Sequence, residues 1–167
     1  MKSNILLIGS GAREHAIAKA ICSSKSEFRL ICLATAKNPG ILQICDKLIE
    51  CDICDAKSVC EYAKEYNIDL AVCGPEAPLA NGVMDALKDI NIKTVGPTKA
   101  LAQLESSKGF TRDLWDRHNI DAQPLYQRFE NEHNLIDLLE RMHPNYVVKA
   151  DGLMGGKGVK VFGEHLD

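Results

Sequence analysis

The sequence predicts an open, doubly wound α/β fold with a parallel sheet over its first hundred residues. Short apolar runs alternate there with segments of helical periodicity, which is the pattern of successive βα units. A glycine-rich turn, Gly9 to Gly11, follows the first apolar run at once, and the alternation stops near residue 100. The hydrophobic share of 46% is large enough for a proper core.

Five apolar runs are the expected strands of this domain, over residues 4–8, 29–34, 47–51, 70–73 and 93–95. The residues between the runs fall into three groups that each share one helical face: Ala16, Ala20 and Ile21; Val59, Ala63 and Tyr66; and Leu79, Val83, Ala86, Leu87 and Ile90. Asp55 is the expected N-cap of the second helix, because its carboxylate can accept the free amides of a first turn.

The pattern changes beyond residue 100 and predicts a linker followed by a second domain. The expected elements are helices over 100–105 and 107–118, a turn-prone stretch over 119–124, a strand over 125–129, a helix capped by Asn131 with the apolar stripe Leu135, Leu138, Leu139 and Met142, and strands over 146–150 and 159–162. A helix on at most three strands buries little area. We therefore predict a first domain over 1–101, linker helices over 102–123, and an incomplete domain over 124–167.

Charge and composition exclude several classes of function. The net charge is −3 and the Lys and Arg residues are scattered, so neither nucleic acid nor an anionic membrane is an expected partner. No apolar run is long enough for a signal peptide or a membrane span, which predicts a cytoplasmic protein. Seven cysteines, an odd number within apolar patterns, favour a reducing compartment. Cys51 and Cys54 lack a second pair and a nearby histidine, which disfavours a redox or zinc site.

The segment Gly9-Ser10-Gly11-Ala12-Arg13-Glu14 lies where the first strand turns into the first helix. A glycine-rich backbone at a helix N-terminus favours a bound phosphate, although a tight turn with nothing bound has the same composition. A dinucleotide fold prefers a third glycine where Glu14 stands, and an acid at the end of the second strand, where this chain has Thr35-Ala36-Lys37. The segment therefore predicts a single phosphate balanced by Arg13 rather than NAD.

The segment Gly74-Pro75-Glu76 follows the fourth strand and so lies at the same carboxyl edge of the sheet, where ligands of such folds bind. Glu76 can accept hydrogen bonds there from a ribose or an amine. A rigid turn between Pro75 and Pro78 is the alternative explanation of the same residues.

A second glycine-rich segment follows the strand expected over 146–150. It contains Gly152, Gly155, Gly156 and Gly158, with Lys149 just before it and Lys157 within it. Such glycines let backbone amides approach an anion, and the two lysines supply countercharge, as a nucleotide triphosphate needs. The Walker spacing is absent. A flexible hairpin connection explains the glycines but not the lysines.

Five motifs in these segments together resemble the phosphoribosylamine-glycine ligases, also called glycinamide ribonucleotide synthetases, which are ATP-grasp enzymes of purine biosynthesis. The motifs are Gly9-Ser10-Gly11-Ala12-Arg13-Glu14-His15-Ala16, Asn38-Pro39-Gly40, Gly74-Pro75-Glu76-Ala77-Pro78-Leu79, Gly96-Pro97-Thr98 with Ala102-Gln103-Leu104-Glu105-Ser106-Ser107-Lys108, and Lys149-Ala150-Asp151-Gly152 with Gly156-Lys157-Gly158. Biotin carboxylase and other purine ATP-grasp ligases share the architecture but not the first and third strings. The family often has glycine where this chain has Ala12.

The resemblance implies a Rossmann-like, pre-ATP-grasp domain followed by the truncated start of an ATP-grasp domain. It implies that ATP phosphorylates glycine to glycyl phosphate, which the amine of phosphoribosylamine attacks to give glycinamide ribonucleotide, ADP and phosphate. Residues 9–14 and 74–76 are then expected to hold phosphoribosylamine. Lys108, Lys149, Asp151 and the loop 152–158 are expected to contact ATP. Mg²⁺ or Mn²⁺ is implied as a cofactor, and its ligands, like most of the glycine site, are expected beyond residue 167.

No catalytic residue is assigned within the chain, and the chain alone is expected to be inactive. One alternative is a non-catalytic phosphoribosyl-binding subunit that works with a second chain carrying the rest of the ATP-grasp domain. A more remote alternative is a nicotinamide-dinucleotide-binding domain, against which Glu14 and the Thr35-Ala36-Lys37 segment argue.

Overall fold

The computed structural model describes residues 2–129 and 135–166. The chain forms two compact units, Met1–Ala102 and Gln103–Asp167. Each unit has its own sheet, and each is described by itself below.

The first unit is built on a five-stranded sheet in the order β3-β2-β1-β4-β5, and every neighbouring pair is parallel. The strands are β1 (Ser3–Ile8), β2 (Phe28–Ala34), β3 (Lys47–Glu50), β4 (Leu70–Cys73) and β5 (Lys93–Val95). All five expected strands are confirmed, with ends that differ by at most a residue. The order reverses direction at β1, so the loops after β1 and β4 share the edge where such sheets bind ligands.

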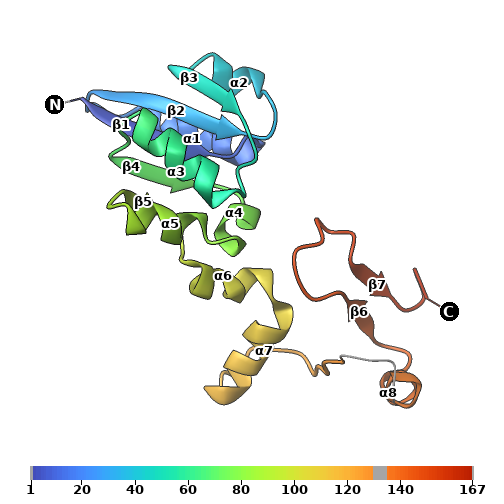
Figure 1. The fold of residues 1–167 in the computed structure, drawn as a ribbon. Helices are drawn as coiled ribbons and strands as arrows, with labels where there is room; N and C mark the ends of the chain where they lie inside the picture. The colour runs from blue at the N-terminus through green and yellow to red at the C-terminus, as the bar shows by residue number, and fades with distance from the viewer. Residues whose placement is uncertain (1, 130–134, 167) are drawn as a thin grey trace. The chain divides into compact units, whose positions relative to one another are not determined.

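Helices cover both faces of this sheet and create two separate cores (Figure 1). Leu6 and Ile8 of β1 face α3 (Ala56–Glu65) and α5 (Val83–Asp89), whereas Leu7 between them faces α1 (Ala12–Cys22) and α2 (Pro39–Leu42). Successive strand residues point to opposite faces, so a continuous apolar run is what a doubly covered strand requires.

The buried face of α1 differs from the expected one. Ala16 and Ala20 are exposed, and the residues buried along the helix are Glu14 and Ala18, with Ile21 partly buried. The reason is that the Glu14 side chain turns inward at the first turn, which determines the face of α1 that is buried. The small side chain of alanine is accommodated on the buried face or on the exposed face. The prediction for α3 is confirmed, because Val59 and Ala63 are buried and the Asp55 carboxylate accepts the amide of Lys57.

The apolar stripe from Leu79 to Ile90 belongs to two helices rather than one. α4 (Glu76–Ala80) ends before Gly82, whose φ of 80° is left-handed, and α5 begins directly after it. Glycine adopts this conformation without steric cost, which allows the break. α6 (Lys99–Ser106) follows β5.

The second unit contains α7 (Lys108–Arg117), α8 (Leu135–Met142) and the antiparallel hairpin of β6 (Val147–Lys149) and β7 (Val159–Val161). The expected strand over 125–129 is wrong, because this stretch has no regular structure and Leu125 is 94% exposed. A strand needs a neighbour to satisfy its backbone, and the pairings in the described part of this unit, β6 with β7 and the bridge Phe162–Leu166, do not include residues 125–129. The expected cap Asn131 lies outside the described residues.

Within residues 2–129 and 135–166 no helix is long and apolar enough to cross a membrane. All seven cysteines are free thiols.

Candidate functional site

The loops after β1 and β4 meet at the carboxyl edge of the first sheet. The amide of Gly9 donates to Leu33 O at 2.8 Å, and the amide of Gly74 donates to Ile8 O at 3.1 Å, so each loop starts from the last rungs of the strand ladder. The Cα of Gly9 packs so tightly that a Cβ there would lie 2.7 Å from the Pro75 ring. The expected substrate-binding set over residues 9–14 and 74–76 is therefore brought together in one place.

An ion pair joins the first turns of α1 and α4, the helices that follow these two loops. Arg13 Nη1 lies 2.7 Å from Glu76 Oε1, and the same nitrogen donates to Gly74 O at 2.9 Å. The side chains are 60% and 30% exposed, so solvent screens the pair and both groups face the open edge of the sheet. The Arg13 guanidinium can bind a phosphate, and the neighbouring Glu76 carboxylate can accept hydrogen bonds from a ribose or an amine.

Glu14 does not face this edge. Its side chain is 4% exposed and turns beneath the loop, where Oε2 accepts the amide of Gly11 at 2.5 Å. The carboxylate thus takes one of the loop amides that a bound anion was expected to use. It also occupies the space that the third glycine of a dinucleotide fold leaves open for close packing of helix on strand.

Asn38 is a residue of this edge that sequence reasoning did not assign to the site. Its Nδ2 donates to Ser10 O at 2.9 Å, and its Oδ1 accepts the amides of Gly40 and Ile41 at 2.9 and 3.2 Å. One side chain thereby fixes the glycine loop to the start of α2. The order Asn-Pro-Gly, an N-cap followed by proline at the first helical position, is the signal that points to it.

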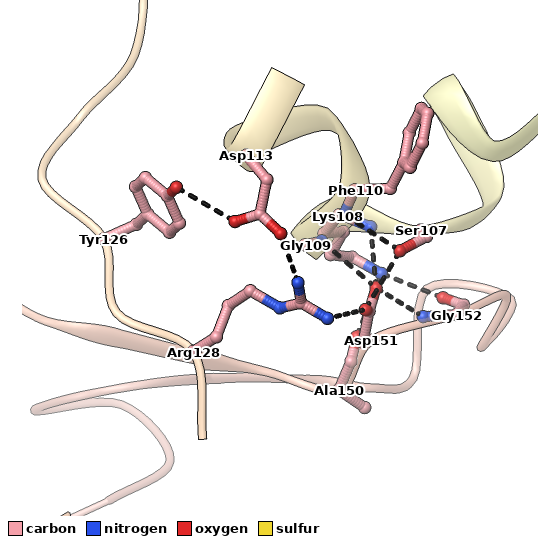
Figure 2. A network of polar contacts seen from close by, with 10 residues as sticks. All are labelled: Ser107, Lys108, Gly109, Phe110, Asp113, Tyr126, Arg128, Ala150, Asp151 and Gly152. Atoms are coloured by element: carbon pink, nitrogen blue, oxygen red, sulfur yellow. Dashed lines mark hydrogen bonds and ion pairs between the residues drawn. The ribbon is translucent and has the colours of Figure 1, made fainter. Parts of the chain in front are cut away.

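In the second unit the Asp151 carboxylate lies at the N-terminus of α7 (Figure 2). Oδ1 accepts the backbone amides of Lys108 at 2.7 Å, Gly152 at 2.9 Å and Gly109 at 3.4 Å, and Oδ2 accepts the Ser107 hydroxyl at 3.0 Å. Partial burial alone raises the pKa of Asp151, but these hydrogen bonds outweigh it and hold the pKa below its usual value.

The Lys108 side chain returns to the same segment. Its Nζ donates to Ala150 O at 3.0 Å and to Gly152 O at 2.9 Å, the carbonyls on either side of Asp151. Lys108, Asp151 and Gly152, all expected to contact ATP, therefore lie together. In this arrangement the ammonium and the carboxylate bond to the chain itself.

Arg128 extends this network to the exposed stretch after α7. Its guanidinium pairs with Asp113 and lies 4.0 Å from Asp151 Oδ2 (Figure 2). Tyr126, two residues earlier, donates to Asp116 at 2.6 Å, and its contacts with Asp116 and Asp113, with burial, raise its pKa to about 12. Tyr126 and Arg128 both belong to the stretch expected as a strand, and the structure places their side chains against the α7 aspartates instead.

The rest of the expected ATP-binding set lies in the β6–β7 hairpin. Lys149 and Lys157 are exposed. Gly155 and Gly156 have φ of 55° and 79°, with open space around both, so the backbone conformation rather than crowding favours glycine there. Among the described residues no group of three or more His, Cys, Asp or Glu is placed to hold a metal ion.

Comparison with known proteins identifies the fold and the family. The structure matches the biotin carboxylase domain of Hydrogenobacter thermophilus 2-oxoglutarate carboxylase, solved with ADP, with a TM-score of 0.75 over 96% of this chain and 37% of that chain, at 13% identity. The fold is thus that of the N-terminal part of an ATP-grasp protein. Residues 3–105 match the N domain of phosphoribosylglycinamide synthetase, and residues 106–166 match its ATP-grasp (A) domain. The chain belongs to this family of purine-biosynthesis ligases, which confirms the resemblance inferred from the five motifs.

Curated relatives carry the name phosphoribosylamine–glycine ligase. The protein of Methanosarcina acetivorans is 44% identical over 99% of this chain, and that of Methanocaldococcus jannaschii is 45% identical over 97% of it. In each case the match covers 37% of the relative, so this chain spans little more than a third of their length.

Proposed function

We propose that this chain supplies the phosphoribosylamine side and the first phosphate-binding elements of a phosphoribosylamine–glycine ligase. Residues 1–101 would bind phosphoribosylamine, and residues 124–167 would begin the ATP-grasp domain. Residues 102–123 would link these two parts. The observation that carries the proposal is the convergence of the β1–α1 and β4–α4 loops, with Arg13 Nη1 2.7 Å from Glu76 Oε1.

The chemistry of phosphoribosylamine fits that edge. Its 5-phosphate is a dianion that suits the Arg13 guanidinium and the N-terminus of α1. Its amine and ribose hydroxyls are donors that suit the Glu76 carboxylate. A loop with a buried carboxylate at position 14 suits one phosphate better than a pyrophosphate.

The reaction that we propose for the whole ligase has two steps. A glycine carboxylate oxygen attacks the γ-phosphorus of ATP, which releases ADP and gives glycyl phosphate. The amine of phosphoribosylamine then attacks the glycyl carbonyl carbon, the C–O bond to phosphate breaks, and the amine loses a proton. The Lys149 and Lys157 side chains would neutralise ATP phosphates, and a closed β6–β7 loop would exclude water from the acyl phosphate.

Titration calorimetry with ribose 5-phosphate, a stable mimic of the phosphoribosyl group, tests the first part. The chain is expected to bind it, and Arg13→Ala is expected to weaken binding at least about tenfold, because a charge-assisted contact is lost. Tight NAD binding without a response to ribose 5-phosphate would contradict the proposal.

The second part is tested by adding a separately produced chain that carries the remainder of a relative's ATP-grasp domain. Glycine-dependent formation of ADP and glycinamide ribonucleotide in the mixture supports the ligase. Ribose 5-phosphate binding without any such turnover would favour a non-catalytic phosphoribosyl-binding subunit instead.

A further inference from the structure

Glu14 is the charged side chain that the described structure buries, with 4% of its surface exposed. Burial of a carboxylate is costly unless hydrogen bonds or charges compensate it. Here Oε2 accepts the Gly11 amide at 2.5 Å, at the N-terminus of an eleven-residue helix. Accepting the Gly11 amide is a role that an apolar side chain of the same size cannot perform.

Three glycines surround this side chain and come from two loops. A Cβ would lie 2.6 Å from Glu14 Cγ if added to Gly9, 2.8 Å from Oε2 if added to Gly11, and 2.7 Å from Cδ if added to Gly74. Real Cβ atoms essentially never approach so closely. The φ of Gly74 is not positive, so its backbone conformation is open to alanine. What excludes a side chain there is the space that Glu14 occupies.

Burial and the Glu14 carboxylate together raise the pKa of two thiols, Cys73 and Cys32, on the strands beside β1. Burial raises the pKa of Cys73 to about 12, and the Glu14 carboxylate adds to this rise. Burial likewise raises the pKa of Cys32 on β2 to about 12, and the Glu14 carboxylate is one of the smaller causes of that rise. The Glu14 side chain itself lies against Gly9, directly after β1, and against Gly74, directly after β4.

We propose that Glu14 is the positioning residue of the phosphoribosyl site, an inference that rests on the proposed function. Its side chain fills the space between the β1–α1 and β4–α4 loops and holds the Gly11 amide, which sets the spacing of the two loops. Arg13 and Glu76 lie in the first turns of α1 and α4, directly after those loops, and both side chains are partly exposed. Glu14 thus acts on the substrate through Arg13 and Glu76, without touching it.

A double-mutant cycle tests the spacing. Gly74→Ala in the otherwise unchanged chain is expected to lower Tm by at least about 4 °C, because the new methyl overlaps Glu14. In a Glu14→Ala background the same change is expected to leave Tm within about 2 °C. If Gly74→Ala alone fails to fold, recovery of folding in the double variant carries the same result. Equal losses in both backgrounds overturn the proposal.

A matched control uses a glycine packed on another side chain. A Cβ on Gly40 would overlap the ring of His15, one residue after Glu14. Glu14→Ala is therefore expected not to relieve Gly40→Ala, whereas His15→Ala is. Relief of both glycine variants by Glu14→Ala would indicate general loosening and contradict a specific role.

Ribose 5-phosphate titration separates positioning from plain stability. Glu14→Gln keeps an acceptor for the Gly11 amide and is expected to stay within about threefold of the wild-type affinity, whereas Glu14→Ala is expected to lose at least about tenfold. Unchanged affinity in Glu14→Ala overturns the proposal. If the wild-type chain binds no ribose 5-phosphate, the proposed function fails and the substrate role of Glu14 with it, while the Tm cycle still decides whether Glu14 spaces the loops.

Discussion

The backbone amide of Lys108 donates to Asp151 Oδ1 at 2.7 Å, across 43 positions of the chain. Helix N-termini are usually capped by the residue just before them, and Ser107 does accept the Phe110 amide at 3.1 Å. Asp151 adds a second cap from a glycine-rich hairpin loop. The N-terminus of α7 and the segment with Gly152 are therefore held by one carboxylate, and the Lys108 ammonium on the Ala150 and Gly152 carbonyls makes the connection reciprocal.

Asp151→Ala is expected to destabilise the second unit by about 0.5–2 kcal/mol, the usual effect of removing a helix cap. Amide hydrogen exchange at Lys108, Gly109 and Gly152 is expected to accelerate, since all three donate to this carboxylate. Asp121→Ala, an exposed carboxylate on the stretch after α7, is the matched control and should leave the exchange rates unchanged. Unaltered exchange in Asp151→Ala would show that Ser107 alone caps the helix.

The same carboxylate predicts a pH dependence. The folded pKa of Asp151 lies below the ordinary value of 3.8, so the unfolded chain takes up a proton first as the pH falls. Its contribution to stability is complete above about pH 5 and is lost as the pH falls through the folded pKa. The Tm difference between wild type and Asp151→Asn is therefore expected to shrink below about pH 4. A difference that is constant from neutral to acid pH would contradict this.

Periodicity was sufficient for the first sheet because its central strands β1 and β2 are covered on both faces and are largely continuously apolar, as in Leu6 and Leu7. It was insufficient for Glu14, since spacing gives no sign that a carboxylate turns inward to meet an amide of its own loop. The strand expected over residues 125–129 was wrong, because Tyr126 and Arg128 contact the α7 aspartates and the stretch pairs with no strand. Local sequence patterns do not predict contacts between segments that are far apart in the chain.

Arg13→Ala is expected to reduce ribose 5-phosphate affinity while leaving Tm almost unchanged. The Arg13–Glu76 pair is exposed and screened, so its net contribution to folding is small, about 0–1 kcal/mol. Arg29→Ala, at the opposite end of the sheet, is the control and should change neither affinity nor the β1–α1 loop. A loss of affinity in Arg29→Ala equal to that in Arg13→Ala would point to net charge rather than to a site.

The seven free thiols are expected to react in an order set by exposure and pKa. Cys22 is exposed and should be alkylated first by iodoacetamide, whereas Cys32 and Cys73 should react last, because burial raises the pKa of each to about 12 and little thiolate forms. Peptide mass spectrometry over a time course reads the order, and unfolding in guanidinium should make all seven react alike. Early modification of Cys73 would mean that the β4–α4 loop opens.

The hairpin lysines provide a test of ATP binding with an internal control. In the β6–β7 pairing Lys149 lies opposite Val159 and Lys160 lies opposite Val148, so the two lysines project from opposite faces of the same hairpin. Lys149→Ala and Lys157→Ala are each expected to weaken ATP binding about tenfold or more in the reconstituted two-chain ligase, since each removes a charge placed beside the glycine loop. Lys160→Ala removes the same charge from the other face and should change ATP affinity less than about twofold, well under 1 kcal/mol. Equal effects of Lys149→Ala and Lys160→Ala would mean that the hairpin attracts ATP only through its net charge, and the phosphate-binding role of the loop would have to be given up.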